Sequence, residues 1–148
     1  MKVSDFLSAA DVTIEAAFAD KKKLLEELAR RAAAAVDLDP ALVHAELENR
    51  EELGSTGMGG GVAIPHARFH RLRTPFGMLV RLKKPIAFEA VDGKPVDTIA
   101  LLLLPDAREG ERLGALACIA RKLRDPTVMM ALRKARDGAD IHRSLTAD

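Results

Sequence analysis

The sequence contains no tryptophan, no tyrosine and a single cysteine, Cys118. A lone cysteine excludes an internal disulfide and is typical of a reducing cytoplasm. Without tryptophan and tyrosine, the chain lacks the usual stacking platforms for sugars and single-stranded nucleic acid, although five phenylalanines remain. The longest apolar run, at 99–104, is far shorter than the roughly 18 residues that span a bilayer. Since the N-terminus also has no signal-peptide pattern, we expect a cytoplasmic protein that is not inserted in a membrane.

Net charge is also nearly absent, because 23 basic and 22 acidic residues leave a formal charge of +1. A dedicated nucleic-acid binder is strongly basic, so no nucleic-acid partner is expected. The chain has 148 residues, of which 48% are hydrophobic and 30% charged. This is a globular composition, and the length suffices to bury a core without disulfides or a metal. We therefore expect residues 1–148 to form one domain.

Helices and strands are interspersed along the chain. Apolar positions at helical spacing and aspartate caps predict helices over 21–36, 40–53, 109–123 and 126–135, with a last short helix from about Asp140. Shorter apolar segments predict strands at 12–14, 62–64, 76–82 and 95–104. The unbroken apolar run at 99–104 is typical of a strand buried on both faces. Helices that flank a central sheet give an α/β fold.

Two finer expectations concern the helix at 109–123. Its predicted buried face carries Leu113, Leu116, Ala120 and Leu123, which recur at helical spacing. Cys118 lies in the middle of this helix among small apolar neighbours, which is typical of a buried cysteine.

Four of the five residues at 57–61 are glycine. Such a stretch can turn tightly and point several N–H groups at one anion. The dinucleotide fingerprint fails because Val62 stands five residues after Gly57, and the P-loop fails because Gly60 stands in the place of its lysine. The stretch is therefore either an anion-binding loop or a loop that lets a helix pack closely on a strand.

His66 follows this stretch directly after Pro65. A neutral imidazole can attack a phosphoryl group, and an ordinary histidine pKa near 6.5 leaves the ring mostly neutral in the cytoplasm. Residues 67–84 contain six Lys or Arg and no Asp or Glu, which gives a positive local field. A surface histidine in a basic turn is the alternative, and the neighbouring glycines favour the phosphoryl acceptor. The other histidines lack the close spacing of metal ligands, so no metal site is expected.

Residues 49–66 read NREELGSTGMGGGVAIPH and resemble the signature of phosphotransferase-system (PTS) IIA proteins of the fructose, mannitol and nitrogen-regulatory type. The resemblance continues in PIAF at 85–88, DGKPVD at 92–97 and LLLLP at 101–105, and it covers roughly residues 4–145. It implies a compact α/β fold with a mixed sheet between helices. It also implies a histidine that takes phosphate from a histidine phosphocarrier protein, without a cofactor.

By this resemblance, His66 is the phosphorylated histidine, through its Nε2 atom, and Arg50 is the catalytic arginine beside it. The residues expected to bind the phosphate are Ser55, Thr56, Gly57, Gly59 and Arg112. The chain departs from the family at Ala67, where the family often has glycine, and at Arg112, where it commonly has a second histidine. Arg112 can neutralise phosphate, but a guanidinium cannot accept a hydrogen bond from an imidazole N–H.

Three functions remain open. The leading hypothesis is a phosphohistidine relay of the nitrogen-regulatory branch, a phosphotransferase component that regulates target proteins through its phosphorylation state. The second is a sugar-specific IIA component that passes phosphate to a IIB protein during fructose or mannitol uptake. The third, kept open by Arg112, is a regulatory binding module that does not transfer phosphate.

Overall fold

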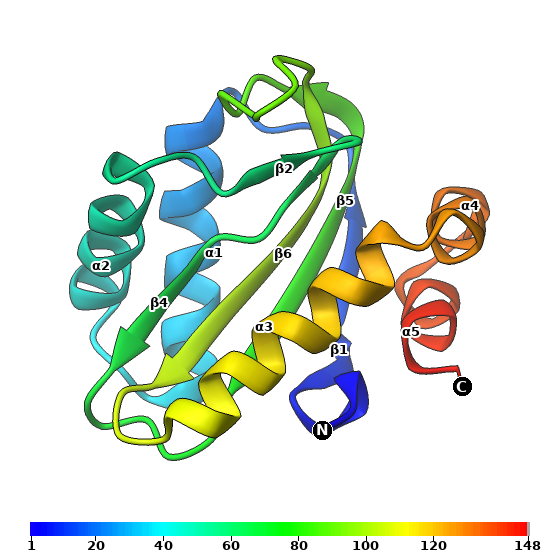
Figure 1. Ribbon diagram of the computed structural model, residues 1–148. Coiled ribbons are helices and arrows are strands. Elements are labelled where there is room, and N and C mark those ends of the chain that lie inside the picture. The colour runs from blue at the N-terminus through cyan, green and yellow to red at the C-terminus, as the bar shows by residue number, and fades with distance from the viewer. Residues whose placement is uncertain (148) are drawn as a thin grey trace.

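The computed structural model describes residues 1–147, and in them six strands form one mixed sheet that lies between helices (Figure 1). The strands are β1 (Leu7–Glu15), β2 (Gly57–Gly59), β3 (Val62–Ala63), β4 (His66–Phe69), β5 (Phe76–Ile86) and β6 (Val96–Pro105). Their order is β1-β5-β6-β3-β2, and β4 also pairs with β6. β6 is antiparallel to β5 and parallel to β3 and β4. The expected α/β fold with a mixed sheet is confirmed.

The helices are the short 3-10 helix Val3–Asp5 and the α-helices α1 (Lys21–Val36), α2 (Pro40–Glu52), α3 (Glu109–Arg124), α4 (Pro126–Lys134) and α5 (Gly138–Thr146). The helices α1, α2 and α4 begin where the sequence places aspartate caps. The Asp20 side chain accepts a hydrogen bond from the Lys23 N–H, and Asp39 and Asp125 cap α2 and α4, each followed by proline at the first helical position. The last helix is capped by Asp137 and not by Asp140, which lies within its first turn.

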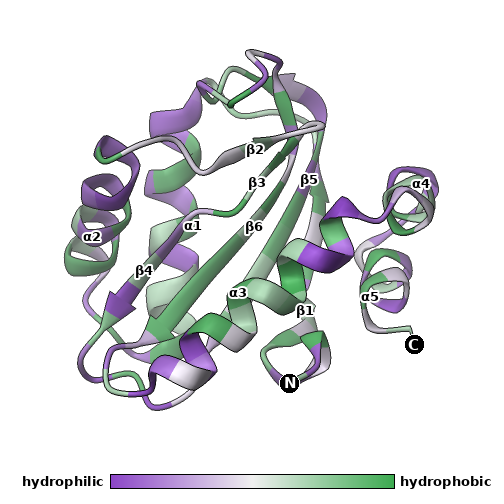
Figure 2. Ribbon diagram, viewed as in Figure 1, coloured by the Kyte–Doolittle hydropathy of each residue, from purple (hydrophilic) through white to green (hydrophobic). Residues whose placement is uncertain are grey.

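β6 carries a hydrophobic core on each of its faces. Ile99, Leu101 and Leu103 pack with α1 and α2, whereas Ala100, Leu102 and Leu104 pack with α3, α4 and α5. The strand is therefore hydrophobic along nearly its whole length, as Figure 2 shows. The predicted burial of this strand on both faces is confirmed, and it makes β6 the element on which β3 and β4 are aligned.

Several expectations about local structure were wrong. β4 was not predicted, and β2 occupies part of the glycine-rich stretch. In α3 the buried row is Ala115, Ile119 and Leu123, which lie four residues apart, while Leu113 is 56% exposed. Cys118 is only half-buried, and its thiol donates to the carbonyl of Met1. Of the predicted face, Leu123 is buried and Leu116 and Ala120 are partly buried, so the helix is rotated only enough to centre Ala115 and Ile119 on the core and to expose Leu113.

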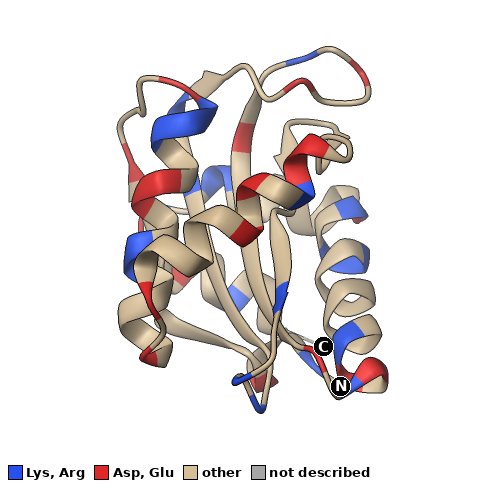
Figure 3. Cartoon of the chain, turned by 90° about the vertical axis from the view of Figure 1, so that its left-hand side faces the viewer, with Lys and Arg blue, Asp and Glu red and all other residues tan. Residues whose placement is uncertain are grey.

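Basic and acidic residues are interspersed along the helices on the side of the molecule that Figure 3 faces. Among the helices of residues 1–147, none combines the length and the apolar character that crossing a bilayer requires.

Gly138 allows α5 to lie directly against β1. A Cβ atom at this position would overlap the carbonyl oxygen of Val12, which is backbone and cannot rotate away. We expect Gly138→Ala to lower the free energy of unfolding by about 1–3 kcal/mol, the usual cost of overpacking. Gly110→Ala is the control, since Gly110 is helical with no atom within 4 Å of the new Cβ. Urea unfolding of both variants tests this, and equal midpoints would contradict the close approach.

Candidate active site

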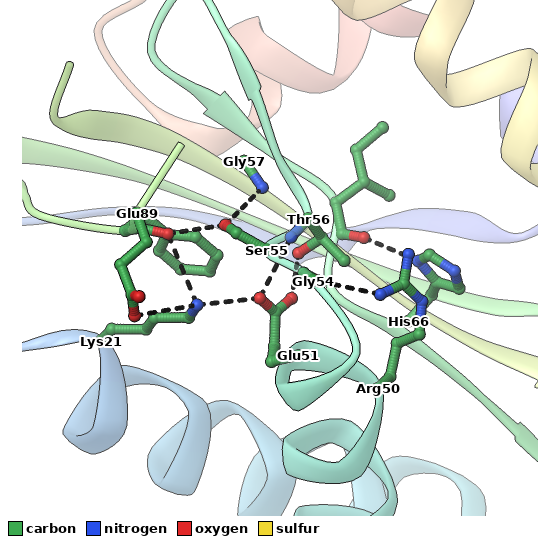
Figure 4. Close-up of polar contacts among 11 residues, drawn as sticks. Lys21, Arg50, Glu51, Gly54, Ser55, Thr56, Gly57, His66 and Glu89 are labelled. Atoms are coloured by element: carbon green, nitrogen blue, oxygen red, sulfur yellow. Dashed lines mark hydrogen bonds and ion pairs between the residues drawn. The ribbon is translucent and has the colours of Figure 1, made fainter. Parts of the chain in front are cut away.

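His66 is the first residue of β4, and its backbone is fixed on both sides. The Pro65 carbonyl accepts a hydrogen bond from the Leu102 N–H at 2.9 Å, and His66 is in register with Leu102 in the parallel ladder. β4 lies between β6 and α2, so that His66 is next to the end of α2, where Arg50 lies (Figures 1 and 4). The buried strand β6 therefore sets the position of the histidine.

The imidazole of His66 has a defined tautomer. Its Nδ1 atom lies 2.9 Å from the carbonyl oxygen of Ile64 (Figure 4). A carbonyl oxygen only accepts hydrogen bonds, so Nδ1 carries the proton. In the neutral ring this leaves Nε2 with a free lone pair, which is the requirement for a nucleophile.

Arg50 lies in the last turn of α2, beside the imidazole (Figure 4). Its Nη1 donates to the carbonyl of Gly54 at 2.9 Å, which holds the guanidinium over the chain that leaves the helix. Arg50 and His66 both line a surface hollow of about 490 Å³, together with Glu46, Asn49, Leu53, Ala67, Arg68 and Asp106. They also line a second hollow of about 380 Å³, which extends toward α3. The two expected catalytic residues are thus brought together.

Burial lowers the pKa of His66 below its ordinary value of 6.5, and the positive charge of Arg50 lowers it further. The hydrogen bond to Ile64 and the charge of Glu51 act in the opposite direction without reversing the shift. The lowered pKa keeps His66 mostly neutral at pH 7.

We expect an NMR titration of the His66 ring to have its midpoint below pH 6.5, because the folded environment disfavours the protonated ring. Acceptance of an electrophile at Nε2 should then stay constant as the pH falls toward this midpoint, and decrease only below it. A midpoint at or above 6.5 would show that burial and Arg50 do not govern this ring.

The loop between α2 and β2 is held by internal hydrogen bonds. The Thr56 N–H and hydroxyl both donate to the carboxylate of Glu51. The Gly57 N–H donates to Ser55 Oγ at 3.0 Å, and the Ser55 hydroxyl donates to the Phe88 carbonyl at 2.7 Å. The second hollow beside His66 is lined by Ser55, Thr56 and Gly57. The amides of Thr56 and Gly57 already donate hydrogen bonds within the loop and to α2.

The glycine-rich stretch forms a β-hairpin. β2 pairs with β3, and positive φ angles occur at Gly59, the last residue of β2, and at Gly60 and Gly61 of the turn. The Gly60 N–H donates to Asp92, and a Cβ at Gly57 would meet Ala90 at 2.7 Å. These glycines therefore pack closely against the loop that contains Ala90 and Asp92, rather than allowing a helix to pack on a strand. Gly59 lies against Asp92 and lines neither hollow beside His66.

Arg112 is also outside both hollows, and its Nη1 donates to the Asp106 carbonyl at 2.9 Å. The α3 residues that line the second hollow are Leu116, Ala120 and Arg124. These continue the four-residue spacing that begins at Arg112, so helical periodicity could have indicated Arg124 as a second cation. Arg68, one of the basic residues that the sequence places just after His66, lines the first hollow.

No three His, Cys, Asp or Glu side chains within residues 1–147 are grouped so that they could hold a metal ion.

Comparison with known proteins gives consistent results. The family model of the phosphoenolpyruvate-dependent sugar phosphotransferase system, EIIA 2, matches residues 5–147. A nitrogen regulatory protein of Bradyrhizobium diazoefficiens is 40% identical over 145 residues, which are 98% of this chain and 95% of the relative. The crystal structure of nitrogen regulatory protein IIA-Ntr from Neisseria meningitidis has a TM-score of 0.91 at 33% identity, covering 97% of this chain and 99% of that one.

The Escherichia coli enzyme IIA for mannitol, solved as a complex with phosphorylated enzyme IIB, has a TM-score of 0.80 and covers 96% of this chain and 98% of its own. At 14% identity this likeness concerns the fold alone. The family match spans nearly the whole sequence, and the relative at 40% identity covers nearly the same residues. The chain therefore belongs to the EIIA 2 family of the phosphoenolpyruvate-dependent sugar phosphotransferase system.

Proposed function

We propose that this protein is a cytoplasmic phosphohistidine relay of the nitrogen-regulatory phosphotransferase system. It takes a phosphoryl group from a histidine phosphocarrier protein onto Nε2 of His66. The observation that carries this proposal is the hydrogen bond from Nδ1 to the Ile64 carbonyl, which leaves Nε2 as the nucleophilic nitrogen. The low pKa of the His66 ring and the adjacent Arg50 both support it.

In the transfer step, the Nε2 lone pair attacks the phosphorus atom in line with the donor's P–N bond. As the new P–N bond forms, the old one breaks, and the donor imidazole leaves with that electron pair. His66 keeps its Nδ1 proton, so the ring gains positive charge, which the Ile64 carbonyl stabilises. Arg50 stabilises the negative charge on the three oxygens of the group in transfer.

Phosphorylation would change the surface on which partners bind. It adds about −1.5 to −2 charges beside Arg50, Arg68 and Arg124. Leu53 and Val91, which line the two hollows, are each 86% exposed and offer apolar contacts next to this charge. A target protein could thus distinguish the two states of His66, and this is how we propose the chain regulates its targets.

Two alternatives are each favoured by one observation. A sugar-specific IIA component that passes phosphate to a IIB protein is favoured by the shared fold with the mannitol enzyme IIA, which was solved with phosphorylated enzyme IIB. A binding module that does not transfer phosphate is favoured by Arg112, which is no histidine and lines neither hollow beside His66.

Incubation with phosphoenolpyruvate, the first phosphotransferase and a histidine phosphocarrier protein tests these functions. We expect intact-protein mass spectrometry to detect the addition of one HPO3 group, which acid removes as it does from phosphohistidine. No addition would contradict the relay and leave the binding module. Rapid transfer from the phosphorylated chain to a fructose or mannitol IIB protein would favour the sugar-specific component.

A further inference from the structure

Glu51 is a buried carboxylate one residue after Arg50. Its side chain is 6% exposed and contacts two residues (Figure 4). Oε1 accepts the Thr56 hydroxyl, while Oε2 accepts the Thr56 N–H at 3.1 Å and pairs with Lys21 Nζ at 2.9 Å. Burying a carboxylate is costly unless it is paired and hydrogen-bonded, so these contacts fix Glu51 in one position.

Lys21 is itself anchored independently of Glu51. Its Nζ atom lies 4.5 Å from the ring centroid of Phe88 and 3.4 Å from the Phe88 carbonyl oxygen. Phe88 is fully buried in the core between the sheet and α1. The carboxylate of Glu51 is therefore paired with a lysine that the buried Phe88 holds in place.

The contacts continue from Thr56 to the imidazole. The Thr56 carbonyl accepts the Ile64 N–H at 3.1 Å, and the Ile64 carbonyl accepts Nδ1–H of His66 at 2.9 Å. Pro65, between them, has a fixed φ near −65°, so little freedom remains once Ile64 is held. A chain of polar contacts thus runs from Lys21 through Glu51, Thr56 and Ile64 to His66.

We propose that Glu51 is a positioning residue for His66, which holds Ile64 through Thr56 so that the ring keeps its proton on Nδ1 and presents Nε2. Glu51 makes no hydrogen bond to the ring. Its charge raises the pKa of His66, and it positions the ring through the backbone that the ring binds. The consequence for phosphoryl transfer rests on the proposed function, whereas the consequence for the tautomer does not.

Glu51→Gln tests this with little change in volume. A Gln side chain has one acceptor oxygen in place of two, and its amide group opposes one of the donors of Thr56 or Lys21. We expect ¹⁵N NMR of the neutral ring to show a smaller Nδ1–H fraction, and the single-turnover rate of phosphoryl acceptance to fall about tenfold, as the loss of one buried hydrogen bond implies. Glu52→Gln is the matched control, because Glu52 is exposed and should leave both readouts unchanged.

Thr56→Val and Thr56→Ser separate positioning from a simple loss of stability. Valine removes the hydroxyl that donates to Glu51, and serine restores it. We expect valine to reproduce both effects of Glu51→Gln and serine to reverse them. If Glu51→Gln and Thr56→Val lower the melting temperature but leave the tautomer and the rate as in the unmodified protein, Glu51 is structural and the proposal is wrong.

A fall in rate with an unchanged tautomer would equally overturn the proposed route through Ile64. If the unmodified chain takes no phosphate at all, the relay function fails while the NMR measurement still decides the role of Glu51.

Discussion

Replacement of His66 by alanine is expected to abolish phosphorylation of this chain. The reason is that Nε2 of His66 is the one imidazole nitrogen that combines a free lone pair, an adjacent arginine and access to the two hollows within residues 1–147. A nucleophile has no substitute when its lone pair is removed, in contrast to a residue that only supports the reaction. Intact-protein mass after incubation with the phosphorylated carrier should therefore show no added HPO3.

His70→Ala is the matched control for this experiment. His70 is exposed and follows β4 four residues after His66, in the same basic segment. Its loss should leave phosphorylation unchanged. Phosphorylation that survives in His66→Ala but disappears in His70→Ala would move the site to the other end of β4. Circular dichroism melts of both variants show whether each still folds.

Local signals in the sequence were sufficient to place the starts of α1, α2 and α4. Asp20, Asp39-Pro40 and Asp125-Pro126 each place a cap beside the first helical residue, so that the start of a helix depends on adjacent residues. β4 had no such signal, because its four residues form a strand only through parallel pairing with β6, more than thirty positions later in the chain. The rotation of α3 is likewise decided by the sheet against which it packs and not by the helix itself.

The candidate site also has a part that could be predicted from the sequence and a part that could not. The match of residues 49–66 to the family signature was enough to pair Arg50 with His66, which the structure brings together. The expected anion-binding amides stay a prediction, and in the structure Glu51 and Ser55 accept the N–H groups of Thr56 and Gly57. The hydrogen-bond partners of a buried side chain depend on atoms that are distant in the sequence. The contacts of Glu51 could not be predicted from the sequence for that reason.

Removal of the charge of Arg50 is expected to lower the rate of phosphoryl acceptance by about 10²–10³-fold, which is the usual effect of losing one donor that stabilises charge in a transition state. Arg50→Gln leaves the phosphoryl oxygens without this cation, while the Ile64 carbonyl still holds the imidazole. Arg50→Lys should recover part of the rate, because it restores the charge without the planar fork of a guanidinium. Arg71→Gln, an exposed arginine after β4, should have no effect.

The pH dependence separates this role of Arg50 from its effect on the ring. Arg50 lowers the pKa of His66, so Arg50→Gln should raise that pKa and move the acid limb of the rate profile to higher pH. At pH 8 the ring is neutral in both proteins, and any remaining loss of rate must come from the missing charge in the transition state. A defect that vanishes at pH 8 would show that Arg50 acts only by keeping His66 deprotonated. A defect that persists there would place the guanidinium on the phosphoryl group itself.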